Sequence, residues 1–279
     1  MKITLRAPAK INWFLKVIGK RQDGFHDLQS LFLPVSLYDS LEIEEADHIS
    51  VTSIPFIPQE ENLIYKAARI LQQETGVKLG ARITCHKEIP LEAGLGGGSS
   101  DAACTLSGLN RLWNVGLTVE ELRSLGAHIG SDVPFFIQPV PSIVRGRGEN
   151  IDPLGFTFPE LTLLLVKPHC GLSTKRVYSN LNRYSPPLDL TKVKEILSTG
   201  NITSLISLSE NDLEAVALRL MPELVDIKKT LLKLGAIHTL LSGSGTTVFG
   251  VFKNEGAASE ASTQFETIWT RVVKIKNSP

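Results

Sequence analysis

The sequence feature that most constrains the fold is a glycine-rich stretch at residues 90–101, Pro-Leu-Glu-Ala-Gly-Leu-Gly-Gly-Gly-Ser-Ser-Asp. It follows a strand-like alternation over residues 81–89 and precedes apolar residues at helical spacing. Glycines permit positive φ angles and let backbone N–H groups approach an anion closely. A helix N-terminus adds unpaired N–H donors and a positive dipole end. The pattern therefore predicts a strand, a phosphate-binding loop and a helix.

Two common phosphate-binding loops do not match this stretch. A Walker A loop needs a lysine after its last glycine, and a dinucleotide fingerprint needs glycine where Ser99 stands. Ser99 and Ser100 can cap the helix and present hydroxyl groups to phosphate oxygens or a bound Mg²⁺. A flexible surface loop ahead of a capped helix is the alternative. The residues that we predict to bind the nucleotide are Pro90, Leu91, Gly94, Leu95, Gly96, Gly97, Gly98, Ser99 and Ser100.

Composition excludes several function classes. Lys and Arg number 29, and Asp and Glu also number 29, so the chain lacks the basic character of nucleic-acid binders. No apolar run approaches the length of a membrane span, and the N-terminus lacks a signal-peptide core. The three cysteines show no metal-ligand spacing. We expect a cytoplasmic protein without a metal site, a nucleic-acid partner or a membrane partner, and either a monomer or a weak dimer.

Apolar spacing divides the chain into strands and helices. Strand-like runs occur at residues 2–7, 11–18, 28–35, 41–45, 49–54, 81–89, 135–137, 161–166, 237–241, 246–252 and 270–275. Helices are expected at residues 62–76, 102–113, 118–126 and 257–265, with several more between 174 and 234. A cluster of Pro153, Gly155 and Pro159 predicts a boundary between domains 1–155 and 156–279. Strands separated by helices make the second domain α+β and ferredoxin-like.

Two charged residues outside the loop are weak candidates when each is considered alone. Lys10 lies between two strand-like runs, where an isolated lysine is usually a solvated charge. Asp132 precedes Val-Pro, where an aspartate is commonly a turn former or helix cap.

Together with the loop, these segments resemble the GHMP superfamily of small-metabolite kinases, which includes galactokinase and the homoserine, mevalonate and phosphomevalonate kinases. The family's loop has the form Pro-x-x-x-Gly-Leu-Gly/Ser-Ser-Ser, which residues 90–100 match. The resemblance is closest to the members that act on a cytidylylated methylerythritol in non-mevalonate isoprenoid biosynthesis. The matching segments, in the family's order, are residues 8–12, 20–26, 94–103, 130–136, 211–214 and 241–245.

The resemblance implies a two-domain α+β GHMP kinase fold, with a nucleotide-binding N-terminal domain similar to a ribosomal-protein module. It also implies a bacterial enzyme with ATP and Mg²⁺ as cofactor, which phosphorylates the 2-hydroxyl of a small-molecule substrate. Lys10 and Asp132 match the family's catalytic pair; Asp132 would take the hydroxyl proton, and Lys10 would stabilise charge. The residues implied to bind the substrate are Asn12, Phe25, His26 and Tyr178, with phenylalanine at position 25 where many members have tyrosine.

One departure and two alternatives remain. Glu92 places an acidic group at the mouth of the loop, where relatives often have small residues. Another GHMP kinase, of mevalonate or homoserine type, is the near alternative, although its substrate has no base for Phe25 and His26 to bind. A non-catalytic RNA-binding module is the distant alternative, which the neutral net charge disfavours.

Overall fold

The computed structural model describes residues 2–278, and the chain forms two compact units that interleave along the sequence. The first unit contains the chain up to Ala9, Leu37–Pro90 and Gly96–Pro139. The second contains Lys10–Ser36, Leu91–Leu95 and the chain from Val140 onward. Two long paired strands, β1 (Lys2–Lys20) and β2 (His26–Ala46), contribute to both units. The predicted boundary after residue 155 treats the domains as contiguous segments and stays a prediction.

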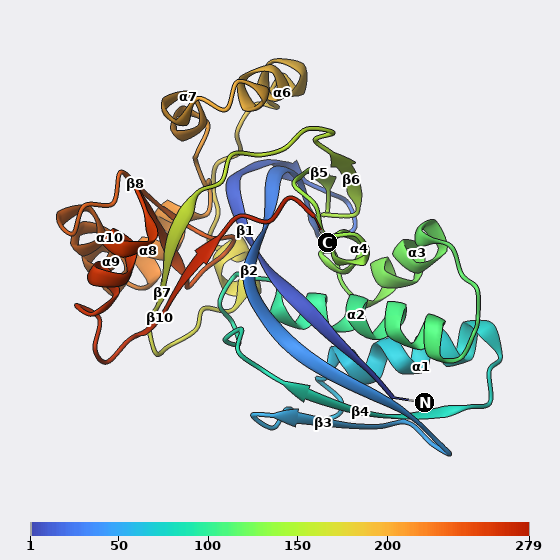
Figure 1. The fold of residues 1–279 in the computed structure, drawn as a ribbon. Helices are drawn as coiled ribbons and strands as arrows, with labels where there is room; N and C mark the ends of the chain where they lie inside the picture. Colours follow the sequence, from blue (N-terminus) through green and yellow to red (C-terminus); the bar gives the residue numbers. More distant parts are fainter. Residues whose placement is uncertain (1, 279) are drawn as a thin grey trace. The chain divides into compact units, whose positions relative to one another are not determined.

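The first unit is a sheet covered by helices. Its strand order is β3-β4-β2, with β4 antiparallel to β2 and parallel to β3. Helices α1 and α2 lie side by side on one face of these strands (Figure 1). A Cβ atom added at Gly108 of α2 would lie 2.7 Å from Ile43 Cδ1 of β2, so glycine permits this close packing. The bounds are β3 Ser50–Ile54, β4 Gly80–His86, α1 Leu63–Thr75, α2 Gly97–Leu112, α3 Val119–Ile129 and α4 Val133–Ile137.

Local sequence signals set the ends of two of these helices. The Asn62 side chain accepts a hydrogen bond from the Ile64 N–H at the start of α1, and Gly76 ends the helix at φ 70°. Thr118 and Glu121 form both halves of a capping box at the start of α3. The predicted start and end of α1 and the predicted start of α3 are confirmed, because the signals that determine them lie within a few residues of the caps. The predicted end of α3 near residue 126 is wrong, since the helix continues to Ile129.

Replacing the cap of α3 should destabilise the first unit modestly. Thr118→Ala removes the hydroxyl that accepts the Glu121 N–H at 3.3 Å, and we expect a loss of ~1 kcal/mol in the free energy of unfolding. Urea unfolding and hydrogen exchange of the first-turn amides of α3 would measure it. Thr75→Ala is the matched control, because the Thr75 hydroxyl only donates to the Leu71 carbonyl near the end of α1. An equal loss in both variants would contradict the capping role.

The second unit contains a four-stranded antiparallel sheet in the order β10-β7-β9-β8. The part of β1 that belongs to this unit contributes Leu15 and Val17 to a hydrophobic core. Leu164 of β7 and Val248 of β9 belong to the same core. A separate part of β2 pairs with β5, and β5 pairs with β6. The bounds are β5 Ser142–Gly146, β6 Asn150–Pro153, β7 Thr162–Lys167, β8 His238–Leu241, β9 Val248–Phe252, β10 Trp269–Lys274, α5 Thr174–Ser179, α6 Leu190–Ser198, α7 Ile202–Ser207, α8 Glu214–Leu220, α9 Glu223–Lys233 and α10 Glu255–Ser262.

The structure corrects several parts of the predicted element map. The two strand-like runs at residues 2–7 and 11–18 form the single strand β1, and α2 begins at Gly97, ahead of the predicted caps Ser99 and Ser100. Residues 135–137 belong to helix α4, not to a strand, and Pro134 in its first turn is favourably placed to start a helix. Strands β5 and β6 were not predicted, because the turn-forming residues between them obscure their short apolar pattern. Among the described residues, no helix is both long and apolar enough to cross a membrane.

Candidate active site

The predicted catalytic lysine lies on β1 in the second unit and is almost fully buried. Lys10 Nζ donates hydrogen bonds to Asn12 Oδ1 at 2.6 Å and to the Gly94 carbonyl at 3.3 Å. Asn12 is 1% exposed, and its amide nitrogen donates to Ser30 Oγ at 2.8 Å. Asn12 therefore orients the ammonium group of Lys10, while its predicted direct contact with substrate stays a prediction.

The first half of the glycine loop is held by the turn between β8 and β9. Ser242 Oγ donates to the Gly94 carbonyl at 3.0 Å, and the Thr247 N–H donates to the Ala93 carbonyl at 3.1 Å. Gly94 has φ 72°, and a Cβ atom added there would lie 2.2 Å from the Ser242 carbonyl oxygen. Glycine is therefore required at position 94 by both backbone angle and space.

The turn between β8 and β9 also lies close to Lys10. Residues 241–245, at the start of this turn, resemble a segment of the GHMP kinases. A Cβ atom added at Gly243 would lie 3.6 Å from Lys10 Nζ, so this glycine sits close to the lysine head group. Asn211 fixes the turn, because its amide nitrogen donates to the carbonyls of Leu241 at 2.9 Å and Gly243 at 2.7 Å. Residues 241–245 thus belong to the surroundings of Lys10, although our candidate set omitted them.

Glu92, which stands where relatives often have a small residue, is accommodated by its local surroundings. Glu92 adopts φ 50°, its carbonyl accepts the Thr246 N–H at 3.3 Å, and the residue is exposed. A Cβ atom added at Gly171 would lie 2.2 Å from Glu92 Oε2, so the carboxylate packs against the Gly171 backbone. The side chain is thereby accommodated within the second unit.

The second half of the loop begins helix α2 in the first unit. Gly96 is the N-cap at φ 73°, and no side chain caps the helix. Ser100 is 1% exposed, and its hydroxyl has no hydrogen-bond partner among the described residues. A helix start with free N–H donors and an unsatisfied hydroxyl is suited to phosphate oxygens.

Asp132 lies in the first unit, close to this helix start. It occupies the N-cap position of α4, but its side chain makes no cap hydrogen bond, so capping does not explain the residue. A Cβ atom added at Gly130 would lie 3.9 Å from Ser99 Oγ, which brings the loop before Asp132 next to α2. Two predicted segments, residues 96–100 and 130–132, are thus neighbours in the first unit.

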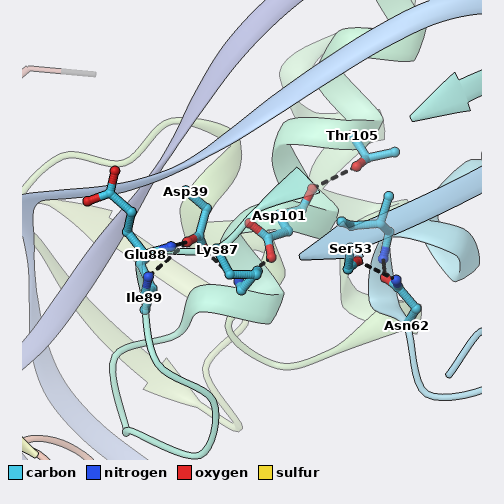
Figure 2. A network of polar contacts seen from close by, with 9 residues as sticks. Asp39, Ser53, Asn62, Lys87, Glu88, Ile89, Asp101 and Thr105 are labelled. Carbon is cyan, nitrogen blue, oxygen red and sulfur yellow. Dashed lines mark hydrogen bonds and ion pairs between the residues drawn. The ribbon is translucent and has the colours of Figure 1, made fainter. Parts of the chain in front are cut away.

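A buried ionic cluster lies beside the same helix start (Figure 2). Lys87 Nζ is paired with the carboxylates of Asp39 and Asp101. Burial and the neighbouring Asp39 carboxylate raise the pKa of Asp101 to about 7, against the opposing effect of Lys87. Burial alone would lower the pKa of Lys87, but Asp101 and Asp39 raise it, so the lysine is charged. Sequence reasoning missed this cluster, because its members lie up to 62 positions apart in the chain.

Aromatic rings gather in the second unit at the predicted base site. The rings of His26 and Tyr178 are stacked at 5.0 Å, and Tyr184 lies 6.1 Å from His26. Phe25 is 47% exposed, and the Arg147 guanidinium covers its ring at 3.9 Å. Burial, with a smaller effect from Lys20, lowers the pKa of His26, so its imidazole is neutral at pH 7. Tyr184 and Arg147 were not among the predicted residues.

The structure thus groups the predicted residues in separate sets. Lys10, Asn12 and Gly94 meet in the second unit, and His26 meets Tyr178 there. Asp132 belongs to the first unit, and its pairing with Lys10 in catalysis stays a prediction. Within residues 2–278, no three His, Cys, Asp or Glu side chains are grouped so that they could hold a metal ion.

Comparison with known proteins gives the family. Residues 62–138 match the model of the GHMP kinases N terminal domain, and residues 193–269 match that of the GHMP kinases C terminal domain. A protein of Thermodesulfovibrio yellowstonii named 4-diphosphocytidyl-2-C-methyl-D-erythritol kinase is 43% identical over 99% of both chains. A Bacillus cereus protein of the same name is 44% identical over 91% of this chain and 90% of its own.

Solved structures agree with this assignment. A crystal structure of 4-(cytidine 5'-diphospho)-2C-methyl-D-erythritol kinase superposes with a TM-score of 0.81 at 33% identity, covering 97% of this chain and 99% of the other. Homoserine kinase from Cytophaga hutchinsonii superposes at 0.73 with 20% identity, over 99% of this chain and 95% of the other, and shares the fold. The chain belongs to the GHMP kinase family, has its two-domain α+β fold, and falls within that family among the 4-diphosphocytidyl-2-C-methyl-D-erythritol kinases.

Proposed function

We propose that this protein transfers the γ-phosphoryl group of ATP to the 2-hydroxyl of 4-diphosphocytidyl-2-C-methyl-D-erythritol, which yields the 2-phosphate and ADP. The observation that carries the proposal is the identity of 43% to a kinase of that name over 99% of both chains. The match includes nearly the whole chain, so it covers the lysine, the aspartate, the glycine loop and the aromatic site together.

The proposed reaction assigns a separate role to each predicted residue. The substrate hydroxyl oxygen forms a bond to the γ-phosphorus while the bond from that phosphorus to the β,γ-bridging oxygen breaks, and ADP leaves. Asp132 takes the hydroxyl proton as general base. Lys10, held by Asn12 and the Gly94 carbonyl, supplies a fixed positive charge. Such fixed charges and N–H donors are what phosphoryl transfer mainly requires.

ATP enters this reaction as its Mg²⁺ complex. Bound Mg²⁺ neutralises the charge that develops on the phosphate oxygens. The Ser100 hydroxyl fits this role in the site, because it is buried in the first turn of α2 without a hydrogen-bond partner among residues 2–278. We therefore assign the backbone N–H groups of residues 96–99 to the phosphate oxygens, and the Ser100 hydroxyl to a phosphate oxygen or to the metal ion that would be bound with them.

The aromatic residues form the proposed site for the cytosine base. The half-exposed ring of Phe25, which carries the Arg147 guanidinium over it, and the stacked pair of His26 and Tyr178 offer flat surfaces, and Tyr184 lies beside His26. A neutral imidazole has one donor and one acceptor nitrogen, which can pair with the polar edge of a base. This arrangement supports a nucleobase-containing acceptor over mevalonate or homoserine.

Removing these side chains should weaken acceptor binding selectively. Tyr178→Ala and Phe25→Ala each remove a stacking surface worth roughly 1–3 kcal/mol, so we expect the acceptor KM to rise about 5- to 150-fold, with the ATP KM nearly unchanged. His26→Ala should also narrow the preference for the cytidine over the uridine acceptor, because a polar site discriminates by leaving mismatched groups unpaired. Steady-state kinetics with both acceptors measure these effects.

Trp269→Ala is the matched control for these variants. Trp269 is an aromatic residue of the same unit whose ring is next to the Arg271 guanidinium, at 5.6 Å, so its loss should leave the acceptor KM unchanged. If only the Phe25 variant behaves like the control, then Phe25 lies outside the base site. If all three variants do, the cytidylylated acceptor is the wrong substrate.

The direct test is an ADP-release assay across a panel of acceptors. We expect turnover with the cytidylylated methylerythritol, and a kcat/KM for mevalonate and homoserine lower by about 10⁴ or more, because those acceptors leave the polar base site unpaired. Equal turnover with mevalonate would assign the chain to another GHMP activity. Salt-sensitive RNA binding without ADP release would favour the RNA-binding alternative.

A further inference from the structure

Three charged side chains in the first unit form a cluster that the proposed chemistry does not use. We call Asp39, Lys87 and Asp101 the Lys87 cluster (Figure 2). Their side chains are 0%, 3% and 3% exposed, so the cluster has essentially no contact with water. They come from three places in the unit, namely strand β2, the residue that follows β4, and the second turn of α2.

The Asp39 side of the cluster holds the chain just before the glycine loop. Asp39 Oδ1 accepts the Glu88 N–H at 2.6 Å and the Ile89 N–H at 2.8 Å, while Oδ2 accepts a hydrogen bond from Lys87. Three consecutive residues are therefore bound to one carboxylate. The next residue is Pro90, where the predicted ATP-binding loop begins.

The Asp101 side holds the chain just after the loop. Lys87 Nζ donates to Asp101 Oδ2 at 2.5 Å. A Cβ atom added at Gly97 would lie 3.3 Å from Lys87 Nζ and 2.8 Å from Ile89 Cγ2. The first turn of α2 thus packs against the lysine head group and against Ile89. One ammonium group connects the two chain segments between which the loop runs.

Stability alone is a poor reason for this cluster. Taking charges out of water is costly, and apolar residues of similar volume often serve a fold equally well. The cluster also holds two carboxylates against one lysine, and Asp101 Oδ1 has no hydrogen-bond partner among the described residues. Its directional hydrogen bonds do provide what apolar packing does not, which is a fixed spacing between residues 87–89 and the start of α2.

We propose that Lys87 is a positioning residue for ATP binding: bridged to Asp39 and Asp101, it fixes both ends of the glycine loop so that the backbone N–H donors meet the triphosphate. Lys87 acts through the loop, because its side chain is 3% exposed and its ammonium group is paired with the two carboxylates. The inference rests on the proposed function only in that the loop binds ATP. A displacement of donors by a fraction of an ångström weakens a preorganised anion site strongly.

The test separates positioning from stability by using variants that affect them differently. Lys87→Met combined with Asp101→Leu replaces the ion pair by apolar side chains, which should keep the fold while removing the bridge. Asp101→Ala removes only the carboxylate that α2 contributes to the bridge. Asp101→Asn keeps an oxygen that can accept a hydrogen bond from Lys87. Leu109→Ala is the control, because Leu109 is fully buried on the same helix two turns beyond Asp101.

The measurements are the dissociation constant of ADP and of a non-hydrolysable ATP analogue by calorimetry, the KM for ATP, kcat, and the unfolding midpoint. We expect the double variant and Asp101→Ala to bind nucleotide at least tenfold more weakly, with kcat at saturating ATP within threefold of wild type. Asp101→Asn should restore affinity to within threefold. Leu109→Ala should lower the unfolding midpoint and leave affinity unchanged.

Several results would overturn the positioning role. Wild-type affinity in the folded double variant would show that the bridge is dispensable, and failure of both bridge variants to fold would make the cluster purely structural. If Leu109→Ala lost as much nucleotide affinity as Asp101→Ala, the weaker binding would follow from lower stability and not from the position of the loop. If wild-type protein binds nucleotide but does not phosphorylate the cytidylylated acceptor, the proposed function fails while the inference about Lys87 stands.

Discussion

Asp132→Asn is expected to fold and bind ATP normally while kcat falls by a factor of about 10² to 10⁴. The substitution is nearly isosteric, and the Asp132 side chain makes no cap hydrogen bond with α4, so no cap of that helix is lost. What disappears is the proton acceptor for the attacking hydroxyl. Single-turnover kinetics, with the ATP and acceptor dissociation constants measured separately, would isolate the loss in the chemical step.

Asp47→Asn is the control, since Asp47 is an exposed aspartate of the same unit. A kcat in Asp132→Asn equal to that of the control would reject Asp132 as the base. Lys10→Met extends the test to the second member of the predicted pair. We expect it to lower kcat as well, because the ammonium group fixed by Asn12 is lost. A change confined to the ATP KM would make Lys10 a binding residue.

Gly94→Ala is expected to raise the ATP KM at least tenfold. The new Cβ atom would lie 2.2 Å from the Ser242 carbonyl oxygen and 3.0 Å from that of Gly245, and both are backbone atoms with little freedom to move. The loop segment must therefore shift, and the hydrogen bond from Ser242 Oγ to the Gly94 carbonyl shifts with it. Because Lys10 donates to the same carbonyl, we also expect kcat to fall.

Gly116→Ala controls for the backbone angle in this experiment. Gly116 has φ 83°, similar to Gly94, but a Cβ atom there would meet nothing within 4 Å. Both variants bear the roughly 1–2 kcal/mol cost of the left-handed conformation, whereas only Gly94→Ala adds the steric conflict. Equal ATP KM and kcat values in the two variants would contradict the steric conflict at position 94.

Parts of the fold determined by neighbouring residues could be predicted from the sequence. Asn62, Gly76 and the Thr118 capping box act within one turn of the helix they limit, so their residue types are sufficient. Helix α4 could not be assigned in this way, because five apolar residues satisfy a strand and a buried helix equally well. The glycine loop was predictable because few other structures require so many glycines ahead of a helix.

The remainder of the site depends on contacts between distant residues. Lys87 lies 48 positions from Asp39, and Ser242 lies 148 positions from Gly94, so no local pattern connects them. Tyr184 comes near His26 only because the chain following α5 returns to the start of β2. A resemblance to a family supplied Lys10 and Asp132 as a pair. Residue chemistry alone would have left each as an ordinary surface charge.

The interleaved units have a consequence for the order of events during translation. The second unit contains Lys10–Ser36, yet the strands β7 and β9, whose side chains share a core with Leu15 and Val17, are made more than 100 residues later. At roughly 5–20 residues per second, the time between the synthesis of that early segment and of these strands is on the order of ten seconds. During this interval its apolar side chains lack their final neighbours, so they stay exposed to solvent on the nascent chain. Slowing elongation between residues 37 and 160 would lengthen that exposure and lower the yield of folded protein.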